Sequence, residues 1–341
     1  MKKSLLLVLI CLLFALNAIA QTDSLTFVKA PWETKTITGG VKWKHYWFKN
    51  NLFHSNQNIN ILEINLHRKV KLALGYEVKK LKPVVDFAKE DNAIAAINGG
   101  FFDVKNGGSV DLIKVDGIGL APTQLAKSGQ RVDHQKGALI FTNGVLSIGR
   151  WDGSTDWESK FNADVMVAGP MLIYHGVMEK LDTSSAFIKT RNPRTGVAVT
   201  CNRILLITID GRNDNAAGVT IVEMAKIVKW LNAKDGINLD GGGSTTMWID
   251  HQTENGVVNY PTDNKKWDHD GARKVANGVG EKVETQCFAS PMHVKDANHR
   301  VSTVVLFLPM LFNIISHSIN INQCFAALFW VADINSVFFF Q

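Results

Sequence analysis

Three consecutive glycines, Gly241 to Gly243, stand between Asp240 and Ser244 and constrain the backbone more than any other stretch of the chain. Glycine loses the most conformational freedom on folding, so three in a row are retained mainly where φ is positive or another group approaches the bare backbone. The apolar segment 237–239 before Asp240 predicts a short strand. The pattern therefore favours a carboxylate at a strand end beside exposed N–H groups, which suits a charged or polyhydroxylated ligand. A tight turn capped by Ser244 is the alternative.

Four other segments also combine glycine, arginine and polar side chains. They are Asn98–Asp103, Arg191–Ala198, Asp210–Arg212 and Gly271–Asn277. In this order, together with the glycine loop, they resemble the phosphodiester glycosidase family over about residues 59–283. The resemblance implies hydrolysis of a sugar-1-phosphodiester, which releases the sugar and exposes a phosphomonoester. It also extends to secreted bacterial relatives that are associated with exopolysaccharide.

The N-terminus has the features of a secretory signal. Lys2 and Lys3 precede an apolar run at 5–16, and small residues at 18 and 20 follow it. We therefore expect residues 1–20 to be removed and the protein to be exported, to the periplasm or the extracellular space. The apolar run is too short to span a bilayer comfortably.

The charge balance argues against a nucleic-acid partner. The net charge of +6 falls to +4 when Lys2 and Lys3 are removed, and the remaining basic residues are scattered among acidic ones. A modest positive charge would suit an anionic glycan or phosphodiester substrate by raising its encounter rate. The oligomeric state is left open.

Short alternating or apolar runs predict many strands and few helices. The expected strands are 59–66, 70–76, 93–97, 138–141, 165–168, 171–174, 196–200, 203–210, 237–240 and 245–249. Helices are expected at 84–91 and 221–231. These elements predict an α+β fold in which residues 21–284 form a single domain with a large mixed or antiparallel sheet and a few packed helices. Cys201 is expected to be a small core residue.

The last segment, 285–341, falls outside the family resemblance. It contains no Asp, Glu, Lys or Arg between residues 301 and 332, yet its longest dense apolar run is shorter than a membrane span. We interpret it as a frameshifted or otherwise atypical apolar C-terminal tail. Weak membrane association through this tail is the alternative.

Three carboxylates are the catalytic candidates. Asp240 is the first choice as base or nucleophile, and Asp210 is the second because it also ends an apolar strand. Both would be exposed at the sheet edge and would face one cleft if their strands were neighbours. Glu223 is the third, although the Thr220–Glu223 spacing is also that of a helix capping box. Because phosphate is a good leaving group, the site needs a carboxylate and a cationic clamp more than a strong acid.

The substrate-binding candidates come from the same segments. Arg194 and Arg212 are forks that could hold phosphate, Asn98 could hold a sugar hydroxyl, and Phe101 or Phe102 could stack on a ring while the other packs in the core. Solvated turns and an edge strand are the alternatives for the arginines, including Arg273. The full set is Asn98, Gly99, Phe101, Asp103, Arg191, Arg194, Thr195, Arg212, Gly241, Gly242, Gly243, Ser244 and Thr245.

No cofactor or metal is expected, since the chain lacks a P-loop, a C-x-x-C pair and a complete EF-hand loop. A Ca²⁺ ion held by clustered Asp residues is left open. Two other functions stay in view beside the hydrolase. One is a catalytically silent glycan-binding or exopolysaccharide-assembly protein, and the other is a phosphodiesterase that cuts the P–O bond.

Overall fold

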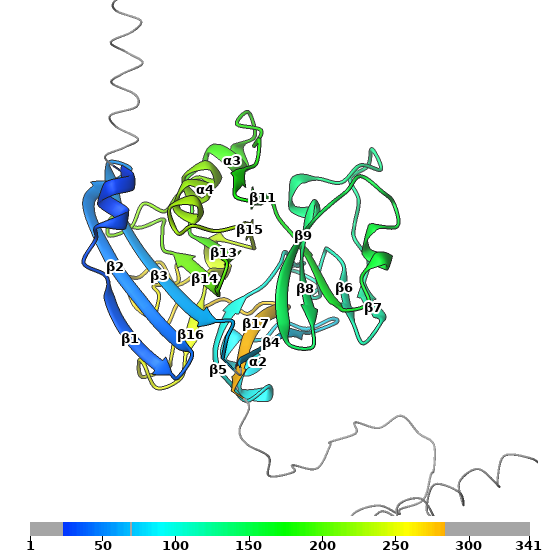
Figure 1. Ribbon diagram of the computed structural model, residues 1–341, viewed down its shortest axis with the longest axis horizontal. Helices are drawn as coiled ribbons and strands as arrows, with labels where there is room; N and C mark the ends of the chain where they lie inside the picture. The colour runs from blue at the N-terminus through cyan, green and yellow to red at the C-terminus, as the bar shows by residue number, and fades with distance from the viewer. Residues whose placement is uncertain (1–22, 69, 284–341) are drawn as a thin grey trace, which may run out of the picture. The chain divides into compact units, whose positions relative to one another are not determined.

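The computed structural model describes residues 23–68 and 70–283 (Figure 1). The expected signal segment 1–20 and the expected tail 285–341 lie outside the described residues. Within the described ranges, no helix is both long and apolar enough to cross a membrane.

Antiparallel strands dominate the described chain, and they form three sheets instead of one large one. Every pairing between named strands is antiparallel. The expected α+β class therefore fits only loosely, and the expectation of a single mixed or antiparallel sheet is corrected. Alternation along a segment identifies a strand and its buried face, but long-range packing decides which strands pair.

The largest sheet has eight strands. In spatial order they are β1 (Glu33–Thr38), β2 (Val41–Leu52), β3 (Ser55–Asn65), β14 (Arg203–Ile209), β13 (Arg194–Val199), β15 (Asp235–Asn238), β11 (Met171–Tyr174) and β12 (Val177–Met178). The two central strands β13 and β14 are buried along most of their length.

The other two sheets have five and four strands. The five-stranded sheet runs β7 (Ile118–Ala121), β6 (Ile113–Val115), β10 (Asp164–Ala168), β8 (Gly137–Thr142) and β9 (Val145–Arg150). The four-stranded sheet runs β16 (Met247–Ile249), β5 (Ala93–Asn98), β17 (Asn277–Val283) and β4 (Val70–Tyr76).

The named helices are short. They are α2 (Val84–Glu90), α3 (Ala186–Lys189) and α4 (Ile221–Trp230), with 3₁₀ turns at Asp133–Gln135, Trp157–Lys160 and Gly242–Ser244. Helix α4 begins at the predicted capping box, in which the Thr220 Oγ1 accepts from the Glu223 N–H and the Glu223 carboxylate accepts from the Thr220 N–H. Its buried side chains pack with those of β2, β3 and β14, so α4 covers one face of the largest sheet (Figure 1).

One cluster of buried side chains joins all three sheets. It includes Leu62 of β3, Ile97 of β5, Leu139 of β8 and Leu206 of β14, each essentially unexposed. The three sheets therefore share a core within the described residues. Cys201 does not belong to it, because the turn between β13 and β14 leaves this residue exposed, contrary to expectation.

Glu281 is an ionisable side chain inside this shared core. It lies on β17 between Leu72 of β4 and Ala95 of β5, it is unexposed, and neither carboxyl oxygen has a hydrogen-bond partner among the described residues. Burial raises the pKa of its carboxyl to about 8. The folded chain therefore binds this proton more tightly than the unfolded chain does.

We expect the free energy of unfolding to fall between about pH 5 and pH 8, because ionisation of Glu281 is disfavoured only in the folded state. The loss should reach about 3 kcal/mol by pH 7. Glu281→Gln should remove most of this slope, and Glu254→Gln, at an exposed position, is the matched control. Denaturant unfolding at several pH values measures it. Parallel stability profiles for wild type and Glu281→Gln would show that Glu281 is not responsible.

Candidate active site

Asp240 directly follows β15 and is anchored through its backbone to the end of β5 in another sheet. Its N–H donates to the Gly99 carbonyl at 3.0 Å, and its own carbonyl accepts from Asn98 Nδ2 at 2.8 Å. The half-buried side chain accepts from the Gly241 N–H at 2.9 Å through Oδ1. Burial raises the pKa of the Asp240 carboxyl to about 6. Ser244, the hydrogen bond from Gly241 and the electrostatic effect of Arg273 and His134 act in the opposite direction and limit this rise. Asp240 is therefore mainly ionised at neutral pH.

Glycine is required at positions in this loop because other side chains contact its backbone closely and leave no space for a Cβ. Gly242 has φ of +62°, and a Cβ there would meet the Arg212 guanidinium. A Cβ on Gly243 would lie 1.9 Å from Asp263 Oδ1. The remaining predicted loop residues, Gly241, Ser244 and Thr245, lie in the same loop, and the Ser244 and Thr245 hydroxyls are buried in it.

Asn98 holds three segments together rather than facing an open site. It is 1% exposed, and its Oδ1 accepts from Thr195 Oγ1 at 2.7 Å and from the Thr246 N–H at 3.1 Å. Both side-chain groups are therefore used inside the protein. Asn98 and Thr195 position the Asp240 backbone. Asn98 was expected to hold a sugar hydroxyl, but its amide is not free to do so.

Of the other residues in this segment, only Phe101 has a side chain beside the site. The centroid of its half-buried ring lies 4.6 Å from that of the His134 ring and 6.0 Å from that of the Phe187 ring, while Phe102 packs in the core. Asp103 accepts from the N–H groups of residues 105 and 106, so it closes its own turn. The backbone hydrogen bond from Asn106 is the main cause that lowers the Asp103 pKa.

Arg194 lies inside the protein and does not present a free fork. Its Nε donates to the Val219 carbonyl at 3.1 Å, and Nη2 donates to the carbonyls of Phe187 and Thr190. Burial lowers the pKa of Arg194 to about 10, with a further contribution from Arg212. Its charge acts on Asp240, but these nitrogens cannot also hold a phosphate in this arrangement.

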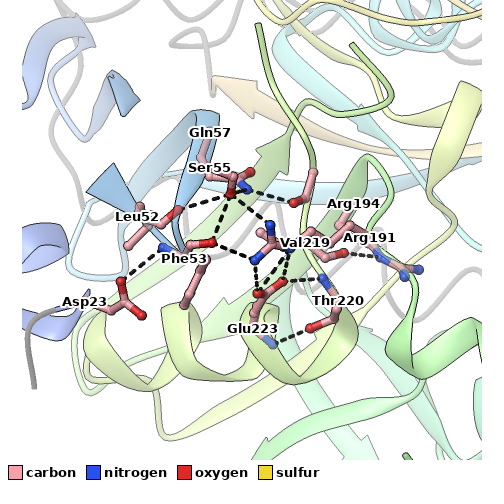
Figure 2. Close-up of polar contacts among 11 residues, drawn as sticks. Asp23, Leu52, Phe53, Ser55, Gln57, Arg191, Arg194, Val219, Thr220 and Glu223 are labelled. Carbon is pink, nitrogen blue, oxygen red and sulfur yellow. Dashed lines mark hydrogen bonds and ion pairs between the residues drawn. The ribbon is translucent and has the colours of Figure 1, made fainter. Parts of the chain in front are cut away.

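Arg191 and Glu223 form an ion pair at the start of α4 (Figure 2). Arg191 Nη2 lies 2.6 Å from Glu223 Oε1, and the same guanidinium donates to Ser55 Oγ and the Phe53 carbonyl. The Glu223 carboxylate also completes the capping box with Thr220. Both charged groups are therefore engaged in joining α4 to the β2–β3 turn, which accounts for Glu223 without a catalytic role.

Asp210 is unexposed, contrary to the expectation of a carboxylate at an open sheet edge. Its oxygens accept from Asn58 Nδ2 at 2.7 Å, Asn259 Nδ2 at 2.9 Å and the Tyr260 N–H at 3.0 Å. Burial is the main influence on the Asp210 pKa and raises it. The strands of Asp210 and Asp240, β14 and β15, are not neighbours either, since β13 lies between them.

Two arginines lie against the glycine loop. Arg212 is exposed, adopts φ of +59°, and uses only Nε, which donates to Asn192 Oδ1 at 2.9 Å; no described residue accepts from its Nη atoms. Arg273 holds Asp263 through two hydrogen bonds above Gly243. We name His134, Arg194, Arg212 and Arg273 the basic cluster. Asp240 forms a salt bridge with no described residue, although Arg194, Arg273 and His134 act on it electrostatically and Arg212 lies against the nearby Gly242.

Sequence reasoning missed His134 and Asp111. The imidazole Nδ1 lies 2.7 Å from Asp111 Oδ2, and Asp111 is unexposed. Both residues lie in loops that carry no recognisable motif, and only the folded chain brings them beside Phe101. Phe187 was missed for the same reason. Among the described residues, no group of three or more His, Cys, Asp or Glu side chains could hold a metal ion.

Solved structures share this fold. The catalytic domain of zebrafish N-acetylglucosamine-1-phosphodiester α-N-acetylglucosaminidase, auto-inhibited by its pro-peptide, aligns with a TM-score of 0.54 and 20% identity over 73% of this chain and 87% of that one. A hypothetical protein from Synechocystis aligns with a TM-score of 0.52 and 18% identity over 74% of this chain. The match spans 63% of the Synechocystis chain. No curated protein matches the sequence.

At these identities the structural likeness establishes a fold shared with a glycosidase domain. The family follows from the sequence itself, since a family model described as phosphodiester glycosidase matches residues 91–281, more than half of the chain. The chain belongs to the phosphodiester glycosidase family.

Proposed function

We propose that this chain is an exported hydrolase of sugar-1-phosphodiesters that releases the sugar and exposes a phosphomonoester. One observation carries the proposal: Asp240, a half-buried carboxylate, has no salt-bridge partner among the described residues although the basic cluster lies around its loop. Arg212 makes no salt bridge with a described residue, and an anionic phosphodiester would balance its charge. The export part of the proposal rests on the sequence of residues 1–20.

Asp240 would act on the anomeric carbon as general base or nucleophile. Both roles need an ionised carboxylate, and the Asp240 pKa of about 6 keeps it ionised at neutral pH without making it a negligible base. Positive charge near the phosphate would stabilise the departing oxygen, and the developing oxocarbenium ion would be stabilised by the same carboxylate.

Arg212 is the best candidate for the phosphate clamp, in place of Arg194. Its Nη atoms are uncommitted among the described residues, and its guanidinium lies against Gly242 in the glycine loop. A planar guanidinium can hold two phosphate oxygens at once, whereas an ammonium group cannot.

Arg212→Lys should lower kcat/KM about tenfold to a hundredfold on a sugar-1-phosphodiester, because the charge remains but the fork is lost. It should lower kcat/KM much less on an aryl glycoside of the same sugar, which has no phosphate. Arg203→Lys, at the opposite end of β14, is the matched control. Equal losses on both substrates would show that Arg212 does not bind the phosphate.

Turnover of a panel of sugar-1-phosphodiesters in ¹⁸O-labelled water tests the proposed function. Label in the released sugar means that the C–O bond is cut, whereas label in the phosphate means P–O cleavage. Tight binding of the panel without turnover would instead favour a glycan-binding or exopolysaccharide-assembly protein.

A further inference from the structure

His134 acts electrostatically on Asp240, and two independent series of contacts connect it to the segments that hold Asp240. In the first, its ring packs 4.6 Å from that of Phe101, three residues after Asn98, which holds the Asp240 carbonyl. In the second, a Cβ on Gly169 would lie 3.0 Å from His134 Cα, and the Gly169 carbonyl accepts from Asn238, two residues before Asp240. The imidazole is therefore part of the Asp240 site.

A buried carboxylate fixes the orientation of this imidazole. Asp111 Oδ2 accepts from His134 Nδ1 at 2.7 Å, and Asp111 Oδ1 accepts from Gln135 Nε2 at 2.8 Å. A carboxylate bound at Nδ1 requires the proton on that nitrogen. Nε2 has no partner among the described residues, and the His134 side chain is 29% exposed. The free nitrogen is therefore available to a ligand.

Simple packing does not explain this arrangement. Burying the Asp111 carboxylate is unfavourable unless its oxygens are satisfied, and the fold supplies both a glutamine amide and an imidazole for them. A histidine that only filled space beside Phe101 would need no such partner. A carboxylate–imidazole pair with one free nitrogen is the usual arrangement for transferring a proton.

We propose that His134 is a catalytic residue whose Nε2 contacts the phosphate of the substrate, with Asp111 as its positioning residue; this inference rests on the proposed function. In the step, a water oxygen bonds to the anomeric carbon and its proton passes to Asp240. The bond between that carbon and the phosphate oxygen breaks, and its electron pair stays on the oxygen. Nε2 gives its proton to a phosphate oxygen. Asp240 then gives its proton to solvent and His134 Nε2 takes one up, which restores the starting state.

Phosphate binding tests the contact without requiring turnover. We expect His134→Gln to weaken binding of inorganic phosphate, measured by titration calorimetry, at least about tenfold, which is ~1.4 kcal/mol. His175→Gln, at an exposed turn after β11, should leave it unchanged. Equal affinity of the wild type and His134→Gln would overturn the proposal, because Nε2 would then not contact phosphate.

Turnover tests the proton transfer. The loss of kcat in His134→Ala should grow as the leaving group becomes more basic, and added imidazole should restore part of the rate. Asp111→Asn should lower kcat with little change in KM. A uniform loss without rescue would overturn the catalytic role. If the wild type turns over no sugar-1-phosphodiester while His134 still binds phosphate, the proposed function fails but the contact stands.

Discussion

Asp240→Asn is expected to lower kcat at least about a thousandfold on a sugar-1-phosphodiester, a loss of roughly 4 kcal/mol in transition-state stabilisation. Asparagine has nearly the same size and can still accept from the Gly241 N–H, so the loop should keep its structure. Only the negative charge is lost. Asp250→Asn, just beyond β16, is the control, and both variants should unfold at the wild-type temperature.

The pH dependence of kcat/KM tests the role of Asp240 independently of the substitution. Below about pH 6 Asp240 takes up a proton, so kcat/KM of the wild type should fall on the acid side with an apparent pKa near 6. Retention of more than a tenth of the wild-type kcat in Asp240→Asn would remove Asp240 from the chemical step.

Asp210→Ala should have the largest effect on stability. It would remove the acceptor of one N–H each of the Asn58 amide, the Asn259 amide and the Tyr260 backbone, although the Asn259 amide would still donate to the Thr245 carbonyl. Each buried unsatisfied group costs about 1–3 kcal/mol, so the free energy of unfolding should fall by at least about 3 kcal/mol. Denaturant unfolding measures it.

A matched variant separates this structural role from a catalytic one. Asp164→Ala removes a carboxylate that, within residues 23–68 and 70–283, accepts from the Asp116 N–H alone, and should cost only about 1 kcal/mol. If the Asp210→Ala variant kept the wild-type stability but lost activity, Asp210 would have a catalytic role, and its hydrogen bonds in the buried network would not be its main contribution.

Local patterns in the sequence predicted single elements well. The expected helix at 221–231 corresponds to α4 because its capping box is a local device, and the apolar run at 203–210 corresponds to β14. Strands β1 and β2 were not expected, because their exposed or half-exposed side chains blur the alternation. The division into three sheets depends on pairings such as β3 with β14, which join residues far apart in sequence.

The sequence predicted the part of the candidate site that depends on an unusual backbone conformation. The glycine loop marked Asp240, since only close packing or positive φ explains such a run. The side chains were harder to assign: Arg194 and Asp210 sit in motifs with the right chemistry but are directed into the protein. Whether an arginine faces a ligand or a carbonyl depends on the neighbouring loops. His134 needed the three-dimensional contact with Asp111, and no spacing in the chain indicates it.

The anchoring of Asp240 to Gly99 and Asn98 has a consequence for how activity is gained during folding. The carboxylate is held by the end of β5, the imidazole by the loop before β8, and Arg194 by β13, so each sheet supplies one component. No sheet alone holds all three of these groups in place. Substrate turnover should therefore appear only when all three sheets have docked, which would make it a sensitive reporter of the last step in folding.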